Sequence, residues 1–158
     1  MSDSPVASLY DWLMFLHILA AMVWVGGLVA LAVFGRYVLR GGQHEAVARF
    51  IGSLRVLGPI MLAPAAVLVL VFGIWMVLDE PAWSFEQAWV WLALLLVVVA
   101  VLVGAVFLSR VALAAERAVA AGDHDGAARQ LARWTWGIWL ILLLLVVATW
   151  DMVFKPGA

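Results

Sequence analysis

The chain has 158 residues, of which 68% are hydrophobic and only 12% are charged, and its formal net charge is −1. Soluble globular domains contain about 45 to 50% apolar and about 25% charged residues, so this composition excludes a soluble domain. The sequence contains no cysteine, which excludes disulfides, iron–sulfur ligation and thiolate metal sites.

Four stretches of the chain contain no Asp, Glu, Lys or Arg: 12–35, 56–78, 87–109 and 134–150. A membrane-spanning helix needs about 20 apolar residues, with about 17 as the lower limit. Because backbone polar groups in lipid must be paired inside their own segment, these runs predict helices. We therefore predict an all-α integral membrane four-helix bundle forming one domain, 1–158, with spans near 10–35, 56–78, 87–109 and 134–153.

The basic residues are concentrated in two of the connecting segments. Eight of the nine lie in 36–55 and 110–133, and only Lys155 lies elsewhere. Arg and Lys in short loops stay on the cytoplasmic side. The two segments are thus predicted to be cytoplasmic loops, and both termini periplasmic, in a multi-pass protein of the bacterial inner membrane. The first span lacks the cationic flank and cleavage site of a signal peptide, so we expect it to be retained.

The two predicted cytoplasmic loops share the pattern Gly-x-His-acid-x-x-Ala-Arg, which begins at Gly42 in the first and at Gly122 in the second. This repeat predicts two tandem helical hairpins related by an axis along the membrane normal. His44 and His124 occupy equivalent places in the pattern and are candidates for a metal pair. Two histidines alone rarely hold a metal, so we predict helix starts here, with Asp123 as an N-cap.

Two features of the first two spans predict close or irregular helix packing. Gly26 and Ala30 offer a small face on the first span for close helix contact. Pro64 lies inside the second span, where its ring should free the carbonyl group of Ile60 and kink the helix. Such a kink either shapes a pocket or only adjusts packing.

The sequence is rich in tryptophan, with ten residues, most of them near span ends, where an indole ring prefers the headgroup interface. Trp24 differs because it falls near the middle of the first span. Its indole N–H there needs a buried partner or a bound ligand. Packing against lipid or a neighbouring helix and contact with a ligand both remain open.

His17 is the only ionisable side chain that we predict deep within a span. Such a group is costly in a membrane and is therefore a functional hypothesis. One interpretation is a neutral imidazole bonded to a backbone carbonyl group or to water. The other is an axial ligand of a haem or a ligand of copper. A second ligand would then come from Met14, Met76 or Met152, or from His17 of a second copy.

The segment 16–28, Leu-His-Ile-Leu-Ala-Ala-Met-Val-Trp-Val-Gly-Gly-Leu, resembles the first-helix signature of the CopD superfamily of bacterial membrane proteins. That superfamily includes the membrane domain of copper-resistance protein CopD, the haem-associated protoporphyrinogen oxidase HemJ and a branch of small four-helix proteins. The tail 151–156, Asp-Met-Val-Phe-Lys-Pro, is most similar to the small branch.

The resemblance implies that the histidine matching His17 binds haem b, as in HemJ-like members, or copper, as inferred for CopD-like members. HemJ-like members also use a Lys in a later helix, and spans two to four of this chain contain none, so the resemblance does not extend to that oxidase activity.

These observations predict a haem- or metal-associated redox or assembly protein. The predicted cofactor-binding residues are His17, Trp24, Met14 and Met76, with His17 as the metal ligand, and no catalytic residue is predicted. Haem b is the favoured cofactor and copper the second, and binding of no cofactor is a third outcome. The alternative is a non-catalytic accessory subunit of a larger respiratory or photosynthetic membrane complex.

The predicted partners are the lipid bilayer and a second copy of the chain in a homodimer, or a larger membrane complex. Nucleic acid is not predicted as a partner, because membrane topology and anionic lipid account for the eight arginines of the two loops.

Overall fold

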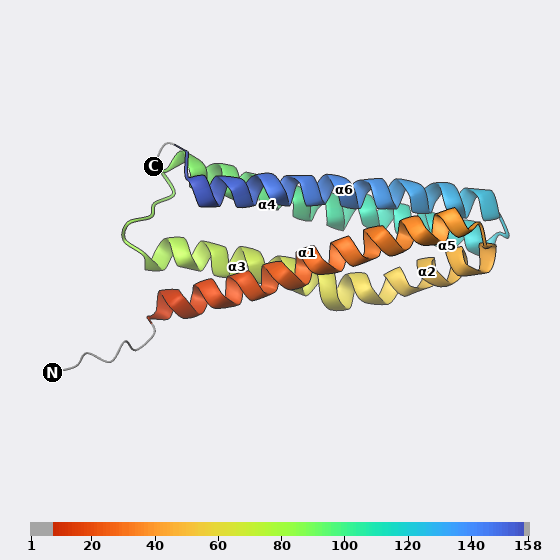
Figure 1. The fold of residues 1–158 in the computed structure, drawn as a ribbon, viewed down its shortest axis with the longest axis horizontal. Coiled ribbons are helices and arrows are strands. Elements are labelled where there is room, and N and C mark those ends of the chain that lie inside the picture. Colours follow the sequence, from red (N-terminus) through yellow and green to blue (C-terminus); the bar gives the residue numbers. More distant parts are fainter. Residues whose placement is uncertain (1–7, 157–158) are drawn as a thin grey trace.

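The computed structural model describes residues 8–156, and every regular element in that range is helical. The elements are α1 (Leu9–Gly41), α2 (His44–Leu57), the π-helical turn η1 (Gly58–Leu62), α3 (Ala63–Asp79), α4 (Ala88–Leu102), the π-helical turn η2 (Val103–Leu108), α5 (Ser109–Ala120) and α6 (His124–Phe154). They join into four long helices, each long and apolar enough to cross a membrane (Figure 1). The predicted all-α, four-helix fold is therefore confirmed.

The four helices are longer than the predicted spans. α1 has 33 residues, so it is about 50 Å long at about 1.5 Å per residue, whereas the hydrocarbon core of a bilayer is about 30 Å thick. The excess lies at the end of the bundle that carries the turns 42–43 and 121–123, here called the Arg-rich end. Most of the two segments predicted as cytoplasmic loops is thus helical.

The opposite end of the bundle, here called the loop end, carries the segment 80–87 between α3 and α4. The first residue of α1 and the last residue of α6 lie at this same end (Figure 1). The described parts of the chain therefore form two hairpins that both turn at the Arg-rich end, as the sequence repeat predicts.

The repeated pattern forms two equivalent turns. Gly42 and Gly122 both have positive φ, at 63° and 71°, a conformation that suits glycine. The rings of His44 and His124, the first residues of α2 and α6, stack with centroids 4.5 Å apart and planes 17° apart. The Asp123 side chain caps α6, as predicted, by accepting a hydrogen bond from the backbone of the helix's first turn. Parallel stacking presents ring faces to each other, so it does not direct two nitrogen lone pairs at one metal.

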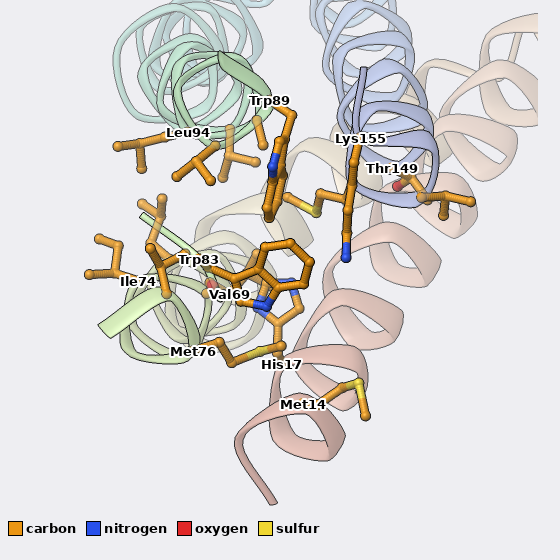
Figure 2. A pocket seen from close by; sticks show the side chains of 18 of the residues that line it. Met14, His17, Val69, Ile74, Met76, Trp83, Trp89, Leu94, Thr149 and Lys155 are labelled. Atoms are coloured by element: carbon orange, nitrogen blue, oxygen red, sulfur yellow. Dashed lines mark hydrogen bonds between the residues drawn. The ribbon is translucent and has the colours of Figure 1, made fainter. Parts of the chain in front are cut away.

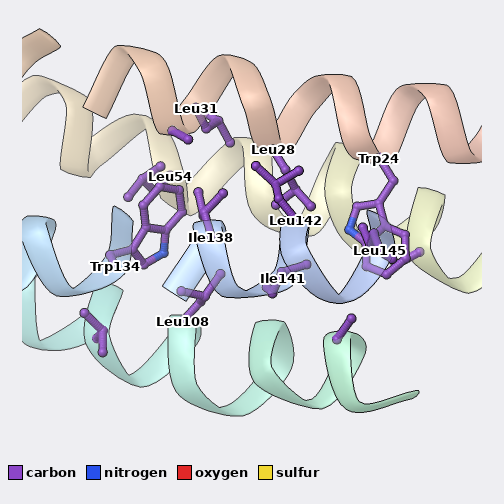
Figure 3. Close-up of a cluster of buried hydrophobic side chains, with 14 of the residues drawn as sticks. Trp24, Leu28, Leu31, Leu54, Leu108, Trp134, Ile138, Ile141, Leu142 and Leu145 are labelled. Carbon is purple, nitrogen blue, oxygen red and sulfur yellow. The ribbon is translucent and has the colours of Figure 1, made fainter. Parts of the chain in front are cut away.

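The core follows the two uninterrupted helices. α1 packs against α3 and α6, α4 packs against α6, and α3 and α4 make little contact with each other. Fully enclosed side chains include Leu28 and Ile138, between α1 and α6, and Ile141, which faces Gly104 of η2; each is at most 1% exposed (Figure 3). Since α3 and α4 are held apart, the loop end has room for a cavity between them.

The irregularity predicted from Pro64 is the π-helical turn η1, which ends two residues before it. This turn packs against Gly27 of α1, where a Cβ atom would lie 2.8 Å from Met61 Cε and 2.9 Å from Leu62 Cδ2. Gly26, the glycine that the sequence singled out for a helix contact, has no atom within 4 Å of a Cβ position. The close contact between the first two spans is thus made by the second glycine of the pair.

The second π-helical turn meets a glycine in the same way. A Cβ atom on Gly137 of α6 would lie 2.5 Å from Leu108 Cδ2 and 2.9 Å from Phe107 Cε1, both in η2. A π-helical turn widens the helix locally, and in each hairpin a glycine of the straight helix leaves room for it.

Candidate functional site

His17 lies on α1 and is partly buried against α3. Its Nδ1 atom is 2.9 Å from the backbone carbonyl oxygen of Val69. Because a carbonyl oxygen can only accept, Nδ1 carries the proton, and Nε2 of a neutral ring keeps its lone pair. The bond to a backbone carbonyl group is the arrangement foreseen in the first interpretation of this histidine.

Gly73 provides the space that the imidazole ring occupies. It follows Val69 by one turn on α3, and a Cβ atom at this position would lie 3.1 Å from Cε1 and 3.4 Å from Nδ1 of His17. Any larger residue would press on the ring and weaken the bond to Val69. The sequence held no distinguishing sign of this role, because one glycine in an apolar span has several possible uses.

A cavity of about 390 Å³ opens beside His17 at the loop end. It is enclosed by α1, α3, α4, α6 and the segment 80–87, and most of its lining is apolar (Figure 2). The three predicted sulfur ligands all line it, together with His17: Met14, Met76 and Met152. The fold therefore brings together side chains that are up to 138 positions apart in the sequence.

The second nitrogen of His17 is available to a ligand in this cavity. Among the described residues Nε2 has no hydrogen-bond partner, and it is not one of the enclosed polar atoms that lack one. A metal-binding histidine typically donates one ring N–H to a carbonyl group or carboxylate, which fixes the tautomer and presents the other nitrogen. The Val69 bond fixes the Nδ1–H tautomer of His17 and leaves Nε2 without a partner among residues 8–156.

Trp24, the other predicted contact of a cofactor, lies elsewhere. Its indole is 4% exposed and belongs to the apolar core, beside Leu145 of α6 (Figure 3). It does not line the cavity. The structure thus groups His17, Met14 and Met76 and places Trp24 outside that group.

A cationic and aromatic cluster stands at the mouth of the cavity, and sequence reasoning did not find it. The Nζ atom of Lys155 lies 3.6 Å from the ring centroid of Trp83 and 5.4 Å from that of Trp89. The two indoles meet edge to face, with centroids 5.1 Å apart and planes 88° apart. Lys155 has a left-handed backbone, with φ 43° and ψ 59°, where it ends α6. One feature of the sequence could have indicated this cluster: Lys155 is the one base outside the two arginine-rich segments.

Asp151 is a second ionisable residue inside a membrane-spanning helix. The sequence placed it at the outer edge of the fourth span, whereas the structure shows it 0% exposed within α6. Neither side-chain oxygen has a hydrogen-bond partner among residues 8–156, and the same is true of the enclosed Nε1 atom of Trp89. His17 is therefore not the only ionisable side chain in the interior of the bundle. A buried polar group without a partner calls for a functional or solvent-based explanation.

The fold and the cavity define a four-helix integral membrane protein with an apolar ligand-sized site at one end. Residues 11–156 match the family described as "Predicted integral membrane protein (DUF2269)", and the chain belongs to this family. Comparisons with curated proteins and with solved structures give no match.

Proposed function

We propose that this membrane protein binds haem in the cavity at the loop end, with Nε2 of His17 as an axial ligand. The observation that carries the proposal is the bond from Nδ1 of His17 to the Val69 carbonyl oxygen, which leaves Nε2 free beside a cavity of about 390 Å³. Small-molecule sites in proteins have volumes of about 300 to 1,000 Å³ and are mostly apolar, as this one is.

The donor set favours a haem over a bare metal ion. Among the described residues no group of three or more His, Cys, Asp or Glu side chains could hold a metal. A bare zinc ion, for example, takes three or four protein ligands, whereas a haem iron needs only one or two from the protein. Met14, Met76 or Met152 would supply the second ligand, or His17 of a second copy would do so across a homodimer.

Copper is the second candidate, and the thioethers support it. Cu(I) prefers soft ligands, and three methionines line the same cavity as His17: Met14, Met76 and Met152. The resemblance of 16–28 to the CopD superfamily, which includes haem- and copper-associated members, supports both candidates.

The chain's own residues would hold and tune the group. Val69 and Gly73 fix the orientation of the imidazole, and the apolar lining limits access of water. Both factors set the reduction potential of an iron centre. A bound haem would supply one-electron chemistry. If the arginine-rich segments are cytoplasmic, this chemistry would take place near the periplasmic face of the inner membrane.

The test is a reduced-minus-oxidised visible spectrum of protein purified in mild detergent from haem-supplemented cells. We expect a Soret band and a sharp reduced α-band in the parent protein, both lost in His17→Ala. His124→Ala is the matched control, because it removes a histidine at the other end of the bundle and should keep the spectrum.

A colourless parent protein would overturn the haem proposal. Elemental analysis of the same samples would then decide on copper, which must be present in the parent and the control and absent from His17→Ala. A parent protein with neither haem nor copper that co-purifies with a constant set of membrane proteins would support an accessory subunit instead.

A further inference from the structure

A groove between α2 and α5 lies at the Arg-rich end, far from the cavity beside His17. Its volume is about 620 Å³. Its lining includes the buried side chain of Ile51 and three small residues, Ala48 and Gly52 from α2 and Ala120 from α5, which leave the space open. Two arginines, Arg55 from α2 and Arg117 from α5, line the same groove.

Neither of these arginines is neutralised by another residue of the range 8–156. The ion pairs of the described residues join Arg49 to Glu45 and Arg129 to Asp123, so Arg55 and Arg117 have no carboxylate partner in that range. Glu116 also lines the groove without pairing with either arginine. The two segments around the groove carry eight arginines and four acidic residues, so this end of the bundle is strongly positive.

The groove begins at the predicted boundary of the hydrocarbon core and extends beyond it along α5. Arg55 directly precedes the apolar stretch 56–78, and Arg117 lies eight residues beyond the apolar stretch that ends at 109, about 12 Å along the helix. The two headgroup layers together add about 10 to 15 Å to a hydrocarbon core of about 30 Å, so each is about 5 to 8 Å thick and the backbone of Arg117 lies beyond it. A long arginine side chain can extend along the helix to reach a phosphate group at this level.

We propose that the α2–α5 groove binds the headgroup of an anionic phospholipid, with the guanidinium groups of Arg55 and Arg117 on its phosphate. Basic pockets between membrane helices bind such headgroups, and a planar guanidinium group matches the geometry of a phosphate oxygen pair. The small lining residues would leave room for the glycerol part. This site is independent of the proposed haem site, which lies at the other end of the bundle.

The experiment compares thermal unfolding of the protein in nanodiscs of phosphatidylglycerol with that in nanodiscs of phosphatidylcholine. Native mass spectrometry of detergent-solubilised samples measures retained lipid. We expect a higher unfolding temperature in phosphatidylglycerol and a retained anionic lipid. Each of Arg55→Gln and Arg117→Gln should weaken lipid binding about fivefold, and the double variant should lose both effects.

A matched control separates this site from the general charge of the Arg-rich end. Arg36→Gln with Arg40→Gln removes two arginines of the same end that do not line the groove, and it should keep the lipid effect. Glu116→Gln removes the one carboxylate from the groove and should strengthen anionic lipid binding. Because Glu116→Gln keeps both arginines, it tests the proposal even where an arginine variant fails to fold.

Four results would overturn the proposal. The first is equal stability in the two lipids, and the second is equal loss of lipid in the Arg36 and Arg40 control. The third is the same stabilisation by inorganic phosphate in detergent without phospholipid, which would assign the groove to a free anion. Displacement of the lipid by a protein partner at the same arginines would assign it to a protein interface.

Discussion

The Nδ1 atom of His17 and the carbonyl oxygen of Val69 are 2.9 Å apart, although the two residues are 52 positions apart in the sequence. This contact fixes the tautomer of the imidazole and joins α1 to α3 at the edge of the cavity. The orientation of the candidate ligand thus depends on a helix other than its own.

The first prediction concerns Gly73, which makes room for the imidazole. Gly73→Leu should displace the His17 ring and destabilise the protein by about 1 to 3 kcal/mol, because the added atoms overlap the ring. Haem bands, if present in the parent protein, should shift or disappear. Gly104→Ala is the control, since a Cβ atom there would lie an ordinary 3.8 Å from Ile141. A normal spectrum and stability in Gly73→Leu would show that the ring is not held as described.

The second prediction uses the adjacent glycines of the first span. Gly27→Leu should lower the free energy of unfolding by about 1 to 3 kcal/mol, because the new side chain meets Met61 and Leu62 of η1. Gly26→Leu should have little effect in the monomer, because no atom lies within 4 Å of its Cβ position. Unfolding in detergent would measure both. A larger effect at Gly26 would indicate that a second copy or another protein covers that face.

The third prediction concerns the buried carboxyl group of Asp151. Replacement by Asn keeps the shape and removes the charge, so Asp151→Asn should raise the free energy of unfolding by about 1 to 3 kcal/mol at neutral pH. Denaturant titration of the detergent-solubilised protein would test this. A destabilised Asn variant would mean that the carboxylate has a favourable partner, such as a bound water or ligand. Asp125→Asn, on the exposed first turn of α6, provides the comparison.

The fourth prediction concerns the contact of Lys155 with the two indoles. Lys155→Gln should cost about 0.5 to 2 kcal/mol of stability, because it removes the cation from the face of Trp83. Lys155→Arg keeps a cation and should retain most of the contact. Thermal unfolding would distinguish the two variants. Equal losses in both would show that the cation over the indole face is not the origin of the effect.

The fifth prediction concerns sidedness, and the absence of cysteine makes the test direct. Ser84→Cys introduces a thiol at an exposed position of the loop end, and Ala121→Cys introduces one at the Arg-rich end. A membrane-impermeant maleimide added to spheroplasts should label the first variant alone, because the arginine-rich segments are predicted to be cytoplasmic. Labelling of the Ala121→Cys variant alone would mean that the orientation is the reverse of the predicted one. The candidate haem site would then lie on the cytoplasmic side.

The sequence alone determined the number and type of the secondary-structure elements, because few backbone structures are stable in lipid. Charge-free runs such as 87–109 must pair their backbone groups internally, so they form helices wherever they pack. The local pattern around Gly122 and Asp123 likewise set the start of α6, since both the turn and the cap use residues close together in the chain. His17 was identifiable because an ionisable side chain in an apolar run stands out in any fold.

Tertiary structure decided which side chains share a site. Only the separation of α3 from α4 creates the cavity, and only the packing of α1 on α3 gives His17 its partner in Val69. The neighbouring helices enclose Asp151, and its own segment does not show this. Its position near the end of an apolar run therefore suggested that it would be exposed. Trp24 is the opposite case. Its position near the middle of the first span suggested a ligand contact, whereas the structure shows it packed in the core. Burial and proximity depend on contacts between helices, and the sequence of a single segment does not reveal those contacts.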